Sequence, residues 1–230
     1  MDINILEFTE GAKRAIGVTV IIDVFRAFSV ACYAYDSGAS RLIATSEPKG
    51  AFDLKKKYKK SVLVGERDEK KISGFDYGNS PTEMLKADLE GVTVIHTTTA
   101  GTNGLVNARK ASVILAASLV NAGVTARYIR SVNPPSVSLV AMGYRASVSA
   151  DEDILCAQLI ADRLQGFETG FDEKISALRN SAGKRFFEPA NIEFSPPTDF
   201  FLCTIVDRFD FVLKAENRPD GHVDLMKIAI

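Results

Sequence analysis

An aspartate and an arginine follow the first strand-like apolar run of this sequence. The run Val18–Ile22 is rich in β-branched residues and ends at Asp23, and Arg26 stands where the next helix is expected to begin. A carboxylate can hold a metal ion, and a guanidinium group can bind a phosphate or a carboxylate through two hydrogen bonds. The pattern predicts metal and anion chemistry at this strand end, although a helix cap with a local ion pair has the same signature.

Two further polar loops follow the strand-like run Ser61–Gly65. The first begins with Glu66 and Arg67, an acid beside a base, which is also a common composition for a surface loop. The second, Gly74–Pro81, has the glycines and proline of a tight turn, and these explain its Asp76 less well. Asn79 and Ser80 of this loop lead to a short expected helix.

A turn rich in threonine and glycine follows another strand-like run. It contains Thr97, Thr98 and Thr99, and then Gly101 and Thr102 at the start of an expected helix. Free backbone N–H groups at a helix N-terminus form a phosphate site, and threonine hydroxyl groups add donors. The segment lacks the Gly-Lys-Ser/Thr ending of a P-loop. A threonine-rich helix cap would have the same composition.

Acids cluster at the start of an expected helix, Asp151–Leu164. Ser149 and Glu152 have the spacing of a capping box, and acids in a first turn are favoured by the helix dipole. These structural roles explain Asp151 and Glu152 individually and leave a metal role for one acid of the cluster, such as Asp153, open.

The sequence does not indicate histidine or covalent cysteine chemistry. His96 lies in an apolar run far from His222, so we expect a core histidine and no histidine-rich zinc site. None of the cysteines begins the Cys-x₅-Arg loop of a cysteine phosphatase. A haloacid-dehalogenase phosphatase would need a second aspartate two residues after Asp23, where this chain has Phe25.

Composition is typical of a globular protein of a reducing compartment. The 28 basic and 29 acidic residues argue against a general nucleic-acid binder and give no polybasic anchor for a membrane surface. No apolar run approaches the roughly 18 residues of a membrane span, and the first ten residues are too acidic for a signal peptide. The three cysteines are widely spaced along the chain: Cys32, Cys156 and Cys203. They fit reduced thiols, so we expect a cytoplasmic location.

Strand-like and helix-like segments must position these clusters, and they alternate along most of the chain. The expected strands are Val18–Ile22, Arg41–Ala44, Ser61–Gly65, Val92–Ile95, Ala111–Ala116 and Ser136–Val140. The expected helices are Ser29–Asp36, Glu47–Lys59, Gly101–Arg109, Ala122–Arg130 and Asp151–Leu164. The alternation predicts an α/β fold of three layers, with a mostly parallel or mixed sheet and helices on both faces. Ligands of such folds bind beyond the carboxyl ends of the strands, where the polar clusters lie.

The chain after Gly166 has a mixed pattern. Glu173–Ser181 is helix-like, whereas Phe200–Val206 and Phe209–Leu213 fit either strands or a helix. Because no repeat or linker divides the sequence, we expect one domain over residues 1–230.

Taken together, these clusters resemble the 2-phosphosulfolactate phosphatase family, often called ComB. The matching pieces, in family order, are Ile22–Ala27, Gly65–Arg67, Gly74–Pro81, Thr97–Thr102, Glu152–Ala157 and Val206–Arg208. The Gly74–Pro81 piece and the threonine turn are the most specific. Three places depart from the family pattern: Ala100 replaces a usual asparagine, Ser73 replaces a usual proline, and Gly143–Ser147 differs from the usual loop.

The resemblance implies an Mg²⁺-dependent phosphatase that converts 2-phosphosulfolactate to sulfolactate and phosphate, a step towards coenzyme M in methanogens. Bacteria that need not make that coenzyme also have members. On this hypothesis Asp23, Arg26 and Glu66 are catalytic. The acids expected to hold Mg²⁺, directly or through water, are Asp23, Glu66, Asp76 and Asp153. The residues expected to bind the phosphate or the acid groups of the substrate are Arg26, Arg67, Asn79, Ser80, Thr97, Thr98, Thr99, Gly101 and Thr102.

Direct attack by water that the ion orients is the preferred route, and an aspartyl-phosphate at Asp23 is the alternative. A different function also fits these residues: a phosphate- or nucleotide-binding sensor could use the threonine turn and the arginines without the acids. The expected partner is a small anionic phosphate ester. A homodimer is possible because it is common among soluble enzymes.

Overall fold

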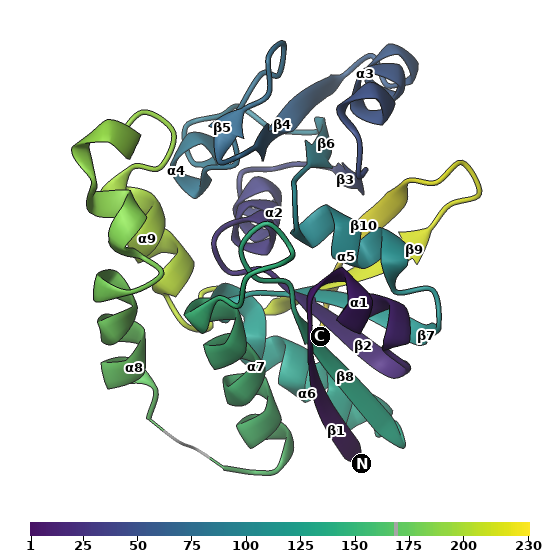
Figure 1. The fold of residues 1–230 in the computed structure, drawn as a ribbon. Coiled ribbons are helices and arrows are strands. Elements are labelled where there is room, and N and C mark those ends of the chain that lie inside the picture. Colours follow the sequence, from purple (N-terminus) through teal and green to yellow (C-terminus); the bar gives the residue numbers. More distant parts are fainter. Residues whose placement is uncertain (168–169) are drawn as a thin grey trace.

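A single ten-stranded sheet dominates the computed structural model, which describes residues 1–167 and 170–230 (Figure 1). The strands are β1 (Asp2–Glu7), β2 (Gly17–Ile22), β3 (Arg41–Ala44), β4 (Ser61–Arg67), β5 (Lys70–Lys71), β6 (Thr93–Thr97), β7 (Ala111–Ala117), β8 (Ser136–Ala141), β9 (Phe211–Asn217) and β10 (Val223–Ala229). Their order across the sheet is β1-β8-β2-β7-β9-β10-β3-β6-β4-β5.

Helices connect most of these strands. The α-helices are α1 (Phe8–Arg14), α2 (Ala27–Asp36), α3 (Pro48–Lys57), α4 (Pro81–Met84), α5 (Gly101–Asn107), α6 (Ala122–Val132), α7 (Asp151–Leu164), α8 (Asp172–Ala177) and α9 (Pro197–Thr204). Short 3₁₀ helices are η1 (Leu119–Asn121), η2 (Leu178–Asn180), η3 (Lys184–Phe187) and η4 (Pro189–Asn191).

Two parallel blocks make up the sheet, and they run in opposite directions. In the first block, strands β1, β8, β2 and β7 pair in parallel. In the second block, strands β3, β6 and β4 pair in parallel. The antiparallel hairpin β9–β10 joins the blocks, since β9 is antiparallel to β7 and β10 is antiparallel to β3. In a flat sheet, the carboxyl ends of β2 and β6 would therefore lie at opposite edges.

Sheet twist brings those two edges together. Five neighbouring pairs separate β2 from β6, and the usual twist per pair accumulates to a rotation on the order of 100°. The sheet wraps around α2, which lies between the two blocks (Figure 1). All of residues 27–35 are buried there, in a core that includes Ile21 of β2, Leu42 of β3 and Val94 of β6. The loops after β2, β4 and β6 consequently meet near the start of α2.

The other face of the sheet is also covered by helices. Helices α6 and α7 pack on the first block through Ile129 and Ile160, against Val20 and Leu139. Helix α3 covers the second block through residues such as Leu54. The predicted α/β architecture, with a mixed sheet and helices on both faces, is confirmed.

Several sequence expectations need correction. The sequence pattern did not predict β1, α1 or β10. The Ser149–Glu152 capping box is not formed, because α7 begins after Ala150 and lacks a side-chain cap. Of the two ambiguous C-terminal runs, the first is mostly the helix α9 and the second leads into strand β9.

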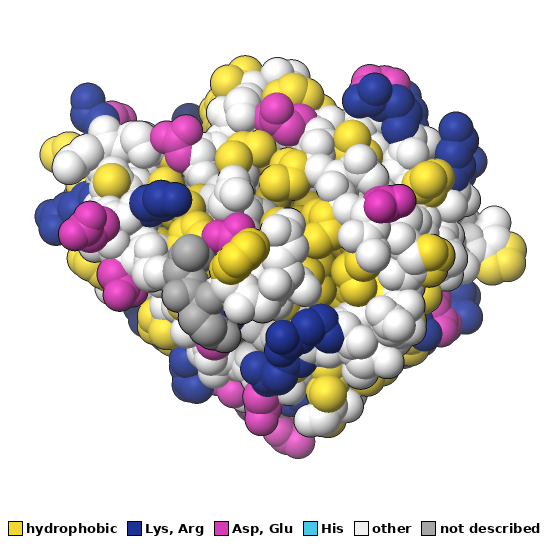
Figure 2. All heavy atoms as spheres, turned by 90° about the horizontal axis from the view of Figure 1, so that it is seen from below, with side chains coloured by type: hydrophobic (Ala, Val, Ile, Leu, Met, Phe, Trp, Pro, Cys, Tyr) yellow, Lys and Arg dark blue, Asp and Glu magenta, His cyan; other side chains and the backbone are white. Residues whose placement is uncertain are grey.

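The surface and the cysteines agree with the composition. Within residues 1–167 and 170–230, no helix has both the length and the apolar character required to cross a membrane. Acidic and basic side chains are interspersed on the face shown in Figure 2, where hydrophobic side chains gather between them. Cys32, Cys156 and Cys203 are buried free thiols.

Candidate active site

Asp23 ends β2, and its side chain is fixed at the start of α2. Its N–H donates to Ala117 O at 3.2 Å, and its Oδ1 accepts the Ala27 N–H at 3.0 Å. The residue is only 7% exposed and lines a cavity between the two blocks of the sheet. Burial raises the pKa of Asp23 to about 6, and the Glu66 carboxylate adds to the rise, whereas the Ala27 N–H and the Arg185 cation oppose it.

Glu66, near the end of β4, lines the same cavity and holds two of its loops. Its Oε1 accepts the Thr99 N–H at 2.7 Å, and its Oε2 accepts the Glu69 N–H at 2.8 Å. A carboxylate has about four lone-pair sites, so each oxygen keeps acceptor capacity for a further partner. Two acids from opposite blocks of the sheet, Asp23 and Glu66, thus share one cavity, as the sequence predicted.

The threonine turn contributes Thr98 and Thr99 to the cavity wall. Thr98 is fixed by Thr102, because each N–H donates to the hydroxyl oxygen of the other, at 3.1 and 3.2 Å. The Thr99 hydroxyl is buried and has no hydrogen-bond partner in the described structure. A Cβ on Gly101 would lie 2.8 Å from Asp23 Oδ2, so only glycine lets α5 come this close to the carboxylate.

Asn79 also lines the cavity and is held from behind by a histidine. The loop before α4 runs beside β4, since the N–H groups of Asp76 and Tyr77 both donate to Leu63 O. Asn79 Oδ1 lies 3.0 Å from His96 Nε2. His96 is 1% exposed, which confirms that it is a core residue, and burial lowers its pKa to about 4.

Asp153 connects two loops next to the cavity without lining it. Its Oδ1 accepts the Val24 N–H at 2.7 Å and its Oδ2 accepts the Gly143 N–H at 2.8 Å. Burial raises the pKa of Asp153 well above its usual range. Burial also raises the pKa of the neighbouring Glu152 to about 7, and its Oε2 is buried with no partner in the part of the chain described.

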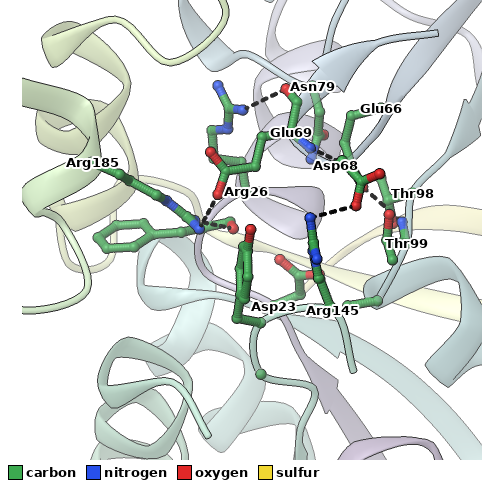
Figure 3. A pocket seen from close by; sticks show the side chains of 14 residues that line it. Asp23, Arg26, Glu66, Asp68, Glu69, Asn79, Thr98, Thr99, Arg145 and Arg185 are labelled. Carbon is green, nitrogen blue, oxygen red and sulfur yellow. Dashed lines mark hydrogen bonds and ion pairs between the residues drawn. The ribbon is translucent and has the colours of Figure 1, made fainter. Parts of the chain in front are cut away.

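Arg185 reaches the cavity from the C-terminal segment, at η3. Figure 3 shows it opposite Glu66, with Asp23 below. Its Nη1 donates to Glu69 Oε1 at 2.8 Å and its Nη2 donates to Phe25 O at 2.9 Å. Sequence analysis did not identify Arg185, since the segment after α8 has no clear periodicity and no motif. Other lining residues were not among its candidate site residues: Phe25, Asp68, Glu69, Ala100, Gly143, Tyr144 and Arg145.

Most of the charges around the cavity neutralise one another. Arg185 pairs with Glu69, and Arg145 pairs with Asp68 at 2.7 Å on the surface. Arg26 is buried and pairs with Asp199. Among the ion pairs of the described residues, none involves Asp23 or Glu66. Two carboxylates that repel each other therefore face one cavity, and within the described residues neither forms an ion pair.

The remaining predicted residues lie outside the cavity. Arg67 turns away, with its guanidinium donating to Glu66 O and Ser46 O. Asp76 is partly exposed, pairs with Lys55 and accepts the Leu63 N–H at 2.7 Å. The others lie behind the cavity wall: Ser80, which donates to Asp199 Oδ1 at 2.8 Å, buried Thr97, and Thr102.

Comparisons with known proteins point to one family. The model of the family described as 2-phosphosulpholactate phosphatase matches residues 4–217. A Bacillus subtilis protein named probable 2-phosphosulfolactate phosphatase is 31% identical over 217 residues, which cover 93% of this chain and 92% of the relative. A protein of the same name from Caldanaerobacter subterraneus subsp. tengcongensis is 34% identical, over 86% of this chain and 87% of the relative. A third, from Caldicellulosiruptor saccharolyticus, is 36% identical over 73% of this chain and 71% of the relative.

Proposed function

Because the chain belongs to the 2-phosphosulpholactate phosphatase family, we propose that it hydrolyses the phosphate ester of a small acidic 2-hydroxy acid, in the first place 2-phosphosulfolactate. The products are the free hydroxy acid, here sulfolactate, and inorganic phosphate. The observation that carries the proposal is the convergence of Asp23 and Glu66 with hydrogen-bond donors from Asn79, Thr98 and Thr99 around one cavity.

The donor set fits Mg²⁺. Within the described residues, no three histidine, cysteine or acidic side chains form a complete ligand cluster. Mg²⁺ commonly uses one or two carboxylates and completes its shell with water and phosphate oxygens, which matches the unpaired Asp23 and Glu66. When bound, the ion would neutralise charge on the phosphoryl group. Asp76 does not reach the cavity, and Asp153 would act through the loops it holds.

The protein's own groups would bind and orient the phosphoryl group. The Asn79 amide and the Thr98 and Thr99 hydroxyls provide uncharged donors, and Arg185 provides a cation opposite Glu66. Arg26 would act mainly by shaping the loop after β2, because Asp199 neutralises it. This arrangement favours a small, doubly charged group over a neutral ligand.

Two chemical routes remain to be separated by experiment. Water can attack phosphorus directly, or an Asp23 oxygen can attack first and form an aspartyl-phosphate that water then cleaves. We propose the direct route. Acid quenching of a single turnover with ³²P-labelled ester would leave the protein unlabelled on that route, and ³²P bound to Asp23 would exclude it.

Phosphate release with and without Mg²⁺ tests the function. The esters are 2-phosphosulfolactate, 2-phospholactate and p-nitrophenyl phosphate, with EDTA as the metal-free condition. We expect Mg²⁺-dependent turnover that is fastest with an acid-bearing ester. A protein that binds inorganic phosphate but releases none from any ester would instead be a sensor. In that case Asp23→Asn would preserve or improve anion binding.

The proposal extends to the location of the protein in the cell, its oligomeric state and the pathway that the reaction serves. The three buried free thiols support a reducing, cytoplasmic location. A homodimer remains a prediction, and light scattering coupled to size-exclusion chromatography would test it. Whether the reaction serves coenzyme M synthesis would follow from the substrate that the assay selects.

A further inference from the structure

His96 lies behind the cavity wall and reaches the site only through Asn79. It is on β6, between β3 and β4, where it is registered opposite Ala44 and Val64. Two flanking strands therefore fix the backbone that carries its ring. Asn79 is 5% exposed and lines the cavity, whereas His96 does not.

The contact between the two side chains determines which nitrogen of the His96 ring carries the hydrogen. Asn79 Oδ1 can only accept a hydrogen bond, so His96 Nε2, 3.0 Å away, must donate one. With the oxygen held in this way, the Nδ2 amino group of Asn79 is turned away from His96. Within the described residues Nδ2 has no hydrogen-bond partner, and it is not among the buried polar atoms that lack one, so it keeps some contact with solvent.

The opposite orientation of the amide would be unfavourable for the proposed reaction. If the amide were flipped, Nδ2 would face His96 and Oδ1 would face the cavity. An oxygen lone pair would then be directed at the negatively charged oxygens of a phosphoryl group. One hydrogen bond from a buried histidine thus decides whether the cavity offers the substrate a donor or an acceptor.

We infer that His96 is a positioning residue, whose Nε2–H holds the Asn79 amide so that Nδ2 donates to a phosphoryl oxygen. The identity of the anion rests on the proposed function, but the orientation of the amide does not. The low pKa of His96 agrees with this role, since a neutral ring can keep one tautomer throughout the working pH range.

The tautomer can be read directly by NMR. The chain has only two histidines, so the His222→Gln variant leaves His96 as the sole histidine signal in a long-range ¹H–¹⁵N correlation spectrum. We expect a neutral ring protonated at Nε2 from pH 6 to pH 8. A ring protonated at Nδ1 and bare at Nε2 would overturn the inference, whatever the protein's activity.

A double-mutant cycle tests the consequence for binding. The probes are inorganic phosphate, measured as Kd, and 2-phosphosulfolactate, measured as kcat/KM. His96→Leu and Asn79→Ala should each weaken both by about 10- to 100-fold, the usual effect of losing one hydrogen bond to a charged group. The double variant should lose no more phosphate affinity or kcat/KM than the worse single variant, because both changes remove the same donor.

A conservative substitution separates positioning from packing. Glutamine can present an N–H at a reach similar to that of Nε2, so His96→Gln should recover most of the loss seen in His96→Leu. Additive losses in the double variant, or a His96→Gln variant no better than His96→Leu, would contradict the inference. If the wild-type protein hydrolyses no ester, the proposed function fails, and phosphate affinity together with the tautomer still decides this inference.

Discussion

The Arg26 guanidinium lies 2.7 Å from Asp199 Oδ2, and both side chains are almost completely buried. The same Nη1 donates to Phe194 O at 2.6 Å. The other Asp199 oxygen accepts hydrogen bonds from Ser80 and Thr82. Asp199 therefore joins α9 to the loop after β2 and to the start of α4. Arg26, expected to bind substrate, lines the cavity and is also the centre of a buried network at its edge.

Asp199→Asn should destabilise the protein strongly. The substitution leaves the Arg26 charge buried without its counter-ion, which typically costs about 3–5 kcal/mol. For a chain of this length the midpoint of thermal unfolding should fall by on the order of 10 °C. Differential scanning calorimetry would measure the shift, with the exposed Asp210→Asn as the matched control. A midpoint within about 2 °C of wild type would show that the pair contributes little.

Stability without divalent ions should fall as pH rises towards 7. The pKa of Asp23 is about 6 in the folded protein, against about 3.9 in an unfolded chain. Between those values the folded state keeps a proton that the unfolded state has released, so deprotonation at higher pH costs folding free energy. Urea unfolding with EDTA should show that a change from pH 4.5 to 7.5 destabilises wild type by about 2 kcal/mol more than Asp23→Asn. An identical pH dependence in the two proteins would refute the raised pKa.

Mg²⁺ should stabilise the folded protein through Asp23 and Glu66. A ligand present at about 100 times its Kd adds about 2.7 kcal/mol to the free energy of unfolding. We expect Mg²⁺ to raise the thermal midpoint of wild type, and this rise to disappear in Asp23→Asn and Glu66→Gln. Asp76→Asn should keep it, because Asp76 lies outside the cavity. Loss of the rise in Asp76→Asn alone would restore the sequence-based prediction that this residue holds the ion.

Arg185→Met should reduce turnover of 2-phosphosulfolactate. The variant loses the cation opposite Glu66 and the bonds to Glu69 and Phe25 O, so kcat/KM should fall about 10- to 100-fold. Arg179→Met is the matched control, since Arg179 is exposed and stacks on Phe187 at 4.4 Å without lining the cavity. Steady-state kinetics measure both variants. An equal kcat/KM in Arg185→Met and Arg179→Met would mean that Arg185 has no special role in turnover.

Sequence patterns predicted most of the central elements but not their relative directions. The periodicity and β-branched runs identified strands such as β2 and β7 and helices such as α7. The reversal between the two blocks arises from the β9–β10 hairpin, and β10 was missed. The carboxyl ends of β2 and β6 meet because the sheet twists through five pairs, a cumulative effect that no local pattern encodes.

The site was predictable where its residues directly follow strands. Asp23, Glu66 and Thr98 were found because each stands at or just beyond the end of a β-branched run. Arg185 was missed, since its segment has no periodicity and it reaches the cavity only through tertiary packing. Arg67 was misplaced for a related reason: next to Glu66 in the chain, it points away from the cavity as neighbouring strand residues do.

The kinetics of two aspartate variants test the central claim most directly. With Mg²⁺ present, kcat/KM for 2-phosphosulfolactate should fall by a factor on the order of 10³ or more in Asp23→Asn, as for loss of a group required in the transition state. It should stay within about threefold of wild type in Asp76→Asn, as expected of a substitution outside the site. An Asp23→Asn protein as active as wild type would contradict the account, whatever family the chain belongs to.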